Sequence, residues 1–438
     1  MKKFAFIGAG SLQFTSTCVK DLLHFDAFRP CEISLMDTNE EHLKMIKKVV
    51  DRIITEMDCP ECVVKATTDR AEALKDADGV LVTVFNGDVD IWRHEIEIPK
   101  KYGIDVNVGD TRNVAGIFRA LRNIPLMLDI CKDIEKYCPK AVMLNYTNPM
   151  PMLCCAMHKY TNVEVMGLCH SVQGTIRMLA KWLDIPHEEI VYTCEGINHI
   201  AFYTKLEYNG EDLYPRLRKL ITENEEVYNR EQVRNEMFLK LGYYVTESSG
   251  HASEYNQWFR KRPDLIEKYC THGTNWNPGL HGFSLDLRLK RKADGIKQYE
   301  EWLEKPFDKE KSAEYAGEIF NARLGDGKPF IFNGNVINHG SIPNLPKDCC
   351  VEVPVVVDKM GFRATVVPEL PRNLATFIST TAQIETMVVE AAMTKNKDMV
   401  YQAVYLDPLS SAVCSLEEIR QMCDELFEVN KEYLGDYK

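Results

Sequence analysis

The opening of the chain, an apolar run followed at once by two spaced glycines, constrains the fold more than any other feature. Residues 2–7 end in an apolar run typical of a buried strand, and residues 14–25 can form a helix. Between them stand Gly8, which permits a tight turn, and Gly10, which lets a pyrophosphate approach the backbone. The N-terminus of the following helix supplies unpaired N–H donors for such an anion. The order of strand, glycine turn and helix predicts the first unit of a dinucleotide-binding fold.

This glycine motif is incomplete, and the next strand strengthens it. Its third position holds Gln13 instead of glycine, so the motif alone also fits a plain structural turn. Residues 32–37 are typical of a second strand that ends in Asp37, 27 positions after Gly10 and beyond the usual spacing of about twenty. An acid there accepts hydrogen bonds from both ribose hydroxyls and repels a 2′-phosphate. The two features predict NAD binding and favour NAD over NADP.

Strands and helices then alternate along the first half of the chain. Residues 79–85 and 141–146 are expected strands, and each follows a helical stretch, at 69–77 and 117–137. This alternation predicts a parallel sheet whose ligands bind at the carboxyl ends of its strands. Asn148 follows one such end, where nicotinamide and substrate would meet, although asparagine before proline is also a common turn former.

The length of 438 residues exceeds the usual size of one domain, so two domains are expected. We predict an α/β protein with a Rossmann-type, doubly wound parallel sheet in an NAD-binding domain over residues 1–196. Residues 197–438 are predicted to form a mixed α/β (α+β) domain that binds substrate and metal. Its expected helices lie near 231–241, 312–324, 373–395 and 416–432, the last two capped by Asn373 and Ser415, and its expected strands lie at 331–337 and 350–356.

The composition excludes several classes of partner. The net charge of −12, with no run rich in lysine or arginine, would repel a nucleic acid backbone. The first apolar run is too short for a signal peptide, and no window approaches the roughly 18 apolar residues of a membrane span. We therefore expect a cytoplasmic protein that binds a small molecule and neither nucleic acid nor membrane.

Fifteen cysteines are scattered through the chain, which is long enough to bury a core without disulfides. Reduced thiols are the expected state. Cys59 and Cys62 have the spacing of a redox or zinc pair, but no second pair or histidine cluster lies nearby in the sequence. We interpret them as incidental surface cysteines.

Two polar peptides follow the next expected strands. One strand ends in Cys169 and His170, and the next leads into Asn198 and His199. A thiolate and an imidazole from separate elements can bind a divalent transition ion and leave positions open for the oxygens of a sugar diol, as catalytic metal sites do. On composition alone, a buried apolar cysteine and a core histidine are the competing interpretation.

Seven stretches of the chain, in order, resemble the family 4 glycoside hydrolases, and most of all their α-galactosidase branch. They are residues 6–11, 35–37, Asn145-Tyr-Thr-Asn-Pro-Met150, residues 167–175, Gly196-Ile-Asn-His-Ile-Ala-Phe-Tyr203, residues 241–249 and residues 344–353. Within this family the residues after the ligand cysteine differ between substrate groups, and Cys169-His-Ser-Val172 resembles the α-galactosidase version. The resemblance implies an enzyme that cleaves α-galactosides and is folded like a lactate or malate dehydrogenase.

The resemblance also implies roles for particular residues. Cys169 and His199 become the ligands of a manganese-like divalent ion, and Asn148 and Asn198 become contacts of the sugar. The residues expected around NAD are Gly8, Gly10, Ser11 and Asp37. Family members further imply a homodimer or homotetramer.

The reaction that the resemblance implies uses NAD as a built-in redox catalyst rather than as a consumed substrate. Hydride leaves C3 of the sugar, a base removes the C2 proton that the new ketone has made acidic, and the aglycone leaves C1 by elimination. Water then adds to the unsaturated ketone, and the hydride returns to C3. The metal ion acts as a Lewis acid on the sugar oxygens, and NAD ends unchanged.

The proton-transfer residues are expected on two segments. Relatives take the base from the region that matches residues 243–249, as a tyrosine or a carboxylate. Here Glu247 is the first choice and Tyr244 the second, with a structural role open for either. His170, next to the thiolate ligand, is expected to protonate the leaving oxygen or to bond a sugar hydroxyl. His251 and Glu254 are candidate further contacts, with solvated loop residues as the alternative.

One loop departs from the family pattern. Relatives commonly carry a glycine-rich run after an Asp-Thr pair, where this chain has Arg112 within residues 109–116. Arg112 can pair with an anionic substituent such as a carboxylate or sulfonate, or it is an exposed loop arginine. Acidic α-glycosides, namely galacturonides, glucuronides or sulfonated sugars, are therefore the alternative substrates. A simple NAD-dependent dehydrogenase and a non-catalytic NAD-binding regulator are the alternatives from other classes.

Overall fold

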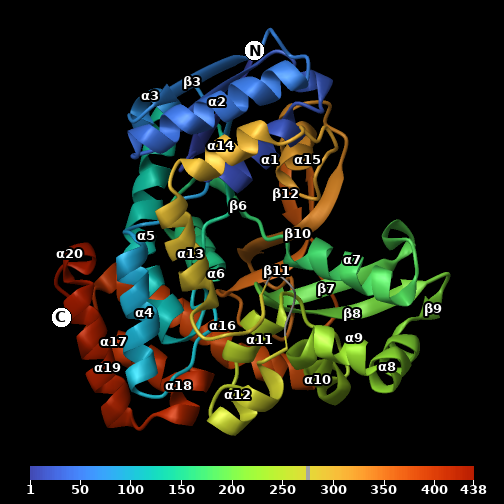
Figure 1. The fold of residues 1–438 in the computed structure, drawn as a ribbon, viewed down its shortest axis with the longest axis vertical. Helices are drawn as coiled ribbons and strands as arrows, with labels where there is room; N and C mark the ends of the chain where they lie inside the picture. The colour runs from blue at the N-terminus through green and yellow to red at the C-terminus, as the bar shows by residue number, and fades with distance from the viewer. Residues whose placement is uncertain (273–276) are drawn as a thin grey trace.

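The computed structural model describes residues 1–272 and 277–438, and Figure 1 shows their arrangement. The first half of the chain alternates strands and helices. These are β1 (Lys2–Ile7), α1 (Leu12–Leu22), β2 (Cys31–Met36), α2 (Glu40–Glu56), β3 (Val63–Thr67), α3 (Arg70–Leu74), β4 (Gly79–Val82), α4 (Val89–Lys101), α5 (Asn113–Tyr137), β5 (Val142–Asn145), α6 (Met150–Tyr160), β6 (Glu164–Gly167) and α7 (Ser171–Leu183).

The second half begins with a β-hairpin, continues through short helices and ends in a helical group. Its elements are β7 (Val191–Ile197), β8 (Ile200–Tyr208), β9 (Glu211–Asp212), α8 (Tyr214–Glu223), α9 (Glu225–Arg230), α10 (Gln232–Leu241), α11 (Ser249–Glu254), α12 (Pro263–Tyr269), α13 (Phe283–Asp294), α14 (Lys297–Glu304), α15 (Ala316–Leu324), β10 (Phe330–Ile337), β11 (Cys350–Asp358), β12 (Gly361–Ala364), α16 (Arg372–Thr394), α17 (Lys397–Leu406), α18 (Pro408–Val413), α19 (Leu416–Val429) and α20 (Lys431–Leu434). Two short 3-10 helices, at Asp26–Phe28 and His187–Glu189, complete the set.

The first six strands form a parallel sheet in the order β3-β2-β1-β4-β5-β6. This is the order of a doubly wound dinucleotide-binding fold, in which the strand order reverses between β1 and β4. Along β1 the side chains alternate between the two faces, with Phe4 and Phe6 in one apolar cluster and Ala5 and Ile7 in the other. The predicted α/β fold class is confirmed, and the β1–β4 junction marks the expected ligand crevice.

The second half of the chain extends the same sheet with antiparallel strands. Strand β10 pairs with β6 through Asn335 and Gly167, and β11, β7, β8 and β9 follow in order, while β12 pairs with β11. The hairpin β7–β8 therefore lies in the same sheet as the parallel strands, and its turn contains His199. The proposed domain division at residue 196 falls within this hairpin and stays a prediction.

Several element boundaries differ from those expected from the sequence. Strand β3 was not predicted because most of its side chains are exposed at the sheet edge, so its sequence lacks the apolar alternation of a half-buried strand. Helix α16 begins after Pro371, and Asn373, the expected cap, lies inside its first turn. Ser415 does cap α19, in a capping box with Glu418.

The interpretation of Cys59 and Cys62 as surface cysteines is wrong. Both side chains are buried, and Sγ of Cys62 lies 3.8 Å from Sγ of Cys31 on β2. They pack where the end of α2 returns to the sheet edge, a contact between residues far apart in the sequence. Their spacing reflects that packing, and neither belongs to a metal-ligating group among the described residues.

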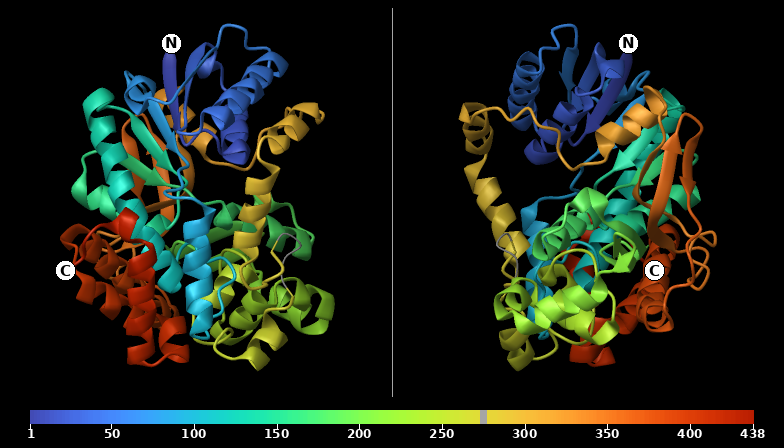
Figure 2. Two further views of the ribbon diagram at one scale, coloured as in Figure 1. Left: turned by 60° about the vertical axis from the view of Figure 1, so that its left-hand side comes forward. Right: turned by 90° about the vertical axis from the view of Figure 1, so that its right-hand side faces the viewer.

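Helices α13 and α14 form an arm that runs from the lower part of the molecule to the N-terminal helices (Figure 2). At its upper end α14 packs on α2, where the Arg52 guanidinium donates to the backbone oxygens of Trp302 and Leu303. The Tyr299 hydroxyl of α14 donates to the Gly10 carbonyl at 2.5 Å. The arm therefore contacts the glycine turn directly. Within residues 1–272 and 277–438, no helix has both the length and the apolar character that crossing a membrane requires.

A fully buried ion pair ties α5 to α4. The Arg122 guanidinium pairs with the Glu95 carboxylate and also bonds Asn86 and Asn430. Arg122→Met is expected to lower the free energy of unfolding by about 3–5 kcal/mol, because it leaves a buried carboxylate without its partner. Chemical denaturation measures this change. The exposed Arg218→Met serves as the control and should cost less than about 0.5 kcal/mol; equal losses would contradict the assignment.

Candidate active site

The turn after β1 cannot accommodate side chains at its two glycines. Gly8 has φ +83°, and a Cβ there would lie 2.4 Å from the Thr83 carbonyl oxygen. The Gly10 N–H donates to Oδ2 of Asp37 at 2.8 Å, and a Cβ on Gly10 would lie 2.7 Å from the same oxygen. The obstacle to a side chain is the backbone just after β4 at Gly8, and the Asp37 side chain just after β2 at Gly10.

The turn has the features of a dinucleotide site. Ser11 occupies the N-cap position of α1 without using its side chain to cap the helix, and the first turn of α1 carries no acidic residue. The helix N-terminus thus presents free donors and a positive dipole to a pyrophosphate. The Asp37 carboxylate, already oriented by Gly10 and by the Asn39 N–H at 2.9 Å, keeps further lone pairs for ribose hydroxyls. These residues fit NAD.

Three potential metal ligands from separate parts of the chain converge. Cys169 follows β6, His199 lies in the turn between β7 and β8, and Glu247 lies just before α11. Their ligand atoms all lie within 4.8 Å of one another, and the side chains are buried. Oε2 of Glu247 is 3.5 Å from Nε2 of His199. A thiol, an imidazole and a carboxylate in this arrangement can hold a divalent transition ion and leave further positions open.

The backbone at two of these ligands is held in the left-handed region. His199 has φ +63° and Glu247 has φ +69°, values that side-chain-bearing residues adopt uncommonly. Such conformations cost free energy and persist at functional sites when the surrounding structure imposes them. Here the β7–β8 hairpin and the isolated bridge between Phe202 and Val245 supply that constraint. The strain is a second sign that the two side chains are placed for a function.

Burial and neighbouring charges act differently on the two acids of the cluster. It raises the pKa of the Cys169 thiol well above its usual value, with the charges of Glu352 and Glu247 acting in the same direction. Burial also raises the pKa of Glu247, but the nearby imidazoles of His251 and His199 outweigh it and hold that pKa below its usual value. The carboxylate is therefore ionised, while the thiol needs a cation to become a thiolate ligand.

A second group shares His199 and extends the site toward α5. Ligand atoms of Asp110, His199 and His251 also lie within 4.8 Å of one another. The Nδ1 atom of His199 is 3.3 Å from both the Thr111 hydroxyl and the Tyr255 hydroxyl. Two proton-accepting or proton-donating groups thus contact the imidazole on the side opposite Glu247.

The two predicted sugar contacts have different surroundings. Asn148 donates from Nδ2 to Oδ2 of Asp110 at 3.0 Å, which places it at the cluster. Asn198 is fully buried beside the Glu352 carboxyl, whose pKa burial raises to about 8. Asn148 thus faces the region where a substrate would lie, and Asn198 contacts the buried layer behind the ligands.

Three other predicted residues belong to neither ligand group. Tyr244 is buried in a separate apolar cluster, where its hydroxyl donates to Asn235 at 3.0 Å. Arg112 is 4% exposed, forms a 2.8 Å ion pair with Glu385 and stands 5.0 Å from the Tyr255 ring centroid. It is neither an exposed loop arginine nor a free cation. His170 is exposed at the N-terminus of α7, with Nδ1 3.7 Å from Glu314.

The two candidate contacts on α11 have different roles. The His251 imidazole lies 3.4 Å from Glu247 and belongs to the cluster. The buried Glu254 carboxylate instead accepts the backbone N–H groups of residues 107–109 at 2.7–2.9 Å, which fixes the loop that carries Asp110. Glu254 therefore positions another residue and does not face a ligand.

Sequence reasoning missed Asp110, Tyr255 and Glu352. Asp110 begins the loop whose departure from the family pattern was noticed, and Tyr255 ends the segment that contains His251. Glu352 lies within an apolar strand, where a single carboxyl is a signal for function, because buried acids are rare without a partner. Only the fold shows that the three meet the ligand cluster.

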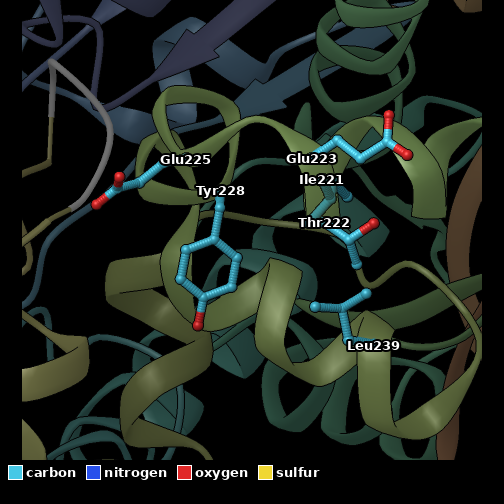
Figure 3. Close-up of a pocket in the computed structure, with 6 residues that line it drawn as sticks. All are labelled: Ile221, Thr222, Glu223, Glu225, Tyr228 and Leu239. Atoms are coloured by element: carbon cyan, nitrogen blue, oxygen red, sulfur yellow. The ribbon is translucent and has the colours of Figure 1, made fainter.

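A surface hollow of about 400 Å³ lies between α8, α9 and α10, away from this cluster (Figure 3). Its lining consists of Ile221, Thr222, Glu223, Glu225, Tyr228 and Leu239. It contains no imidazole, thiol or guanidinium, and none of the predicted site residues. The convergent chemistry therefore lies in the buried cluster and not in this hollow.

Known proteins share both the sequence and the fold of this chain. The α-galactosidase of Bacillus subtilis (strain 168) is 37% identical, over 100% of both chains. The α-galactosidase of Rhizobium meliloti (strain 1021) is 36% identical over 99% of this chain and 89% of that protein. A 6-phospho-α-glucosidase from gut microorganisms, solved in complex with NAD and Mn²⁺, has a TM-score of 0.83 at 22% identity and covers 100% of both chains.

Two family models match nearly all of the chain. The model of the family 4 glycosyl hydrolases matches residues 3–185, and the model of their C-terminal domain matches residues 194–410. These matches and the full-length relatives agree with the resemblance that the seven stretches carried. The chain therefore belongs to family 4 of the glycosyl hydrolases.

Proposed function

We propose that this protein is an α-galactosidase that uses bound NAD and a divalent cation, Mn²⁺ in the first instance, to cleave the glycosidic bond. The observation that carries the proposal is the convergence of Cys169, His199 and Glu247 within 4.8 Å. The Cys169 and His199 pair was expected from the sequence, and the full-length relatives named α-galactosidase support the substrate. When bound, NAD takes and returns the hydride at C3, and the cation polarises the neighbouring sugar oxygens.

The chain holds the two groups with separate elements. Gly8, Gly10, Ser11 and Asp37 bind the dinucleotide at the β1–α1 turn, while Cys169 and His199 bind the cation. Glu247 was expected to be the base, but its place among the ligand atoms supports a third ligand. Asn148, fixed by Asp110, binds a sugar hydroxyl.

Tyr255 is then the best-placed base for the C2 proton. Its hydroxyl contacts His199 at 3.3 Å, whereas Tyr244 is bonded to Asn235 in a different cluster. Burial and the charges of Asp110 and Glu254 raise the pKa of Tyr255 well above its usual value, and the Arg112 guanidinium, 5.0 Å from the ring centroid, acts in the opposite direction. The phenol therefore needs the bound cation beside it to act as a base. Arg112 is thus a positioning residue in this proposal, and Tyr255 takes the proton at its phenolic oxygen.

His170 supplies the proton to the leaving oxygen. It is 59% exposed and stands at the outer side of the ligand cysteine, where an aglycone would extend toward solvent. The Glu314 carboxyl lies 3.7 Å from Nδ1 of this imidazole. Water would then add at C1 in place of the aglycone.

The structure bears on the acidic alternative through Arg112. That alternative rests on Arg112 as the partner of an anionic substituent, but its charge is already matched by Glu385 in a buried ion pair. A second anion there would compete with Glu385. This supports a neutral sugar over a uronide or sulfonated sugar.

The substrate class is tested with 4-nitrophenyl α-galactoside, α-glucoside and α-galacturonide, in the presence of NAD and Mn²⁺ under reducing conditions. We expect the α-galactoside to turn over fastest, without net NADH, and with deuterium from solvent at C2 of the product. Net NADH would identify a dehydrogenase. Cleavage without deuterium at C2 would reject the elimination route.

We also propose a homodimer or homotetramer, as the family implies. The exposed apolar side chains Ile331, Met360 and Val366 near strands β10 to β12 support a subunit contact on that side. Light scattering on the purified protein measures the assembly.

A further inference from the structure

Three arginines of the α5 segment have different surroundings. Arg112 and Arg119 both leave guanidinium nitrogens without a hydrogen bond, but Arg119 also has no ion pair among the described residues. Arg112 pairs with Glu385, and Arg122 is fully bonded to Glu95, Asn86 and Asn430. Arg119 is 5% exposed, yet its Nε and Nη1 atoms find no hydrogen-bond acceptor among the described residues. Leaving buried guanidinium donors unpaired is costly, so a ligand that supplies acceptors would recover that free energy.

The side chain of Arg119 lies between two aromatic rings. Its guanidinium carbon is 4.6 Å from the ring centroid of Trp92 on α4 and 4.9 Å from that of Phe85, which follows β4. The two rings are 5.7 Å apart. The Nε1 atom of Trp92 is also buried without a hydrogen-bond partner in the described part of the chain. Arg119 and Trp92 therefore place hydrogen-bond donors without acceptors next to each other.

The nearby carboxylates do not satisfy these donors. Glu95 is engaged by Arg122, and Asp110 accepts from Thr111 at 2.7 Å and from Asn148 at 3.0 Å. Burial lowers the pKa of Arg119 to about 10, and Asp110 acts against that shift, so the guanidinium stays charged at neutral pH. Burial raises the pKa of Asp110, but nearby charges outweigh it and hold that pKa at about 2, Arg119 being one of them. The two charges influence each other without a direct bond.

This position faces the proposed active site. Asn123, one helical turn after Arg119 on the same face of α5, donates to the Asn148 carbonyl at 3.1 Å. Asn148 in turn bonds Asp110, which belongs to the cluster with His199. Arg119 thus lies beside the substrate region, and Asp110 lies between it and the proposed metal ligands.

We propose that Arg119, with the Trp92 indole N–H, forms a subsite for the C6 hydroxymethyl group of the galactoside. In a pyranose, C5 and C6 lie on the edge opposite C2 and C3, the edge that the proposed cation site holds. The hydroxymethyl group combines a methylene, which packs on Phe85 and Trp92, with an oxygen that accepts from both donors. Asp110 offsets the charge of Arg119, so a neutral acceptor suffices. This inference rests on the proposed function.

The test compares two substrates that differ only at C6. 4-Nitrophenyl β-L-arabinopyranoside has the ring configuration of the α-D-galactopyranoside but lacks the hydroxymethyl group. Arg119→Met is expected to lower kcat/KM for the galactoside by about ten- to hundredfold and to leave the arabinoside unchanged. Trp92→Phe, which keeps the ring and removes one donor, should give a smaller loss of the same selectivity. Arg218→Met, at an exposed arginine that stands 5.0 Å from the Phe238 ring centroid, is the matched control.

A binding measurement separates this subsite from the cleavage reaction. Calorimetry on the holoenzyme gives the ratio of its affinity for D-galactose to its affinity for L-arabinose. This ratio should exceed one in the wild type and fall toward one in Arg119→Met. If both variants lower kcat/KM equally for the two substrates, or lower only NAD affinity, the C6 assignment is wrong. If the wild type prefers the α-galacturonide and Arg119→Met removes that preference, the subsite stands and the neutral-sugar function fails.

Discussion

Cys169→Ser is expected to abolish Mn²⁺ binding and to lower kcat/KM for the α-galactoside by about a thousandfold, because a catalytic metal supplies several kcal/mol of transition-state stabilisation. Cys169 lies within 4.8 Å of the ligand atoms of His199 and Glu247, and a neutral hydroxyl replaces a thiolate there. Calorimetric titration with Mn²⁺ measures the first effect, and steady-state kinetics with NAD present measures the second.

A matched control comes from the other buried thiols. Cys131 is equally buried in α5, but its Sγ contacts Met143 and lies outside the ligand groups. Cys131→Ser should therefore retain Mn²⁺ binding and activity, with some loss of stability. If Cys169→Ser keeps both metal binding and turnover, the proposed centre is wrong, and a non-catalytic NAD-binding protein becomes the better interpretation.

Tyr255→Phe is expected to lower kcat by about 10²–10⁴-fold, the range that general base catalysis contributes. The variant removes the hydroxyl that contacts His199 at 3.3 Å and keeps the ring over which Arg112 stands. Exchange of the C2 proton with solvent deuterium should stop, while Mn²⁺ affinity stays near that of the wild type. Nuclear magnetic resonance of the sugar follows the exchange directly.

Glu247→Gln is the informative companion to this variant. If Glu247 is a ligand, the substitution weakens Mn²⁺ binding, and added metal restores part of the activity. If Glu247 is instead the base, Glu247→Gln still binds Mn²⁺ but no longer exchanges the C2 proton of the sugar with solvent. In that case Tyr255→Phe catalyses this exchange at the wild-type rate. The two patterns are opposite, so one pair of variants decides between the residues.

The active-site assignments differ in how far the sequence alone supported them. The glycine turn and Asp37 are local features, since a strand, a turn and an acid at the end of the next strand follow from short-range patterns. Cys169 and His199 each follow a strand, but the family resemblance, and not their position, assigned them as ligands. Tyr255 and Arg119 gave no such signal, because one lies on a short helix–loop segment and the other inside a long helix.

The dinucleotide turn, the α/β class and the family could be predicted from the amino-acid sequence, because strand alternation, glycine spacing and the seven stretches are properties of neighbouring residues. Which polar side chains contact one another follows from the fold. It paired Arg112 with Glu385, placed Tyr244 away from the ligands and left two guanidinium nitrogens of Arg119 without a hydrogen-bond acceptor among the described residues. The physical reason is that each of these outcomes depends on contacts between segments far apart in the chain, where burial decides which charges must find a partner.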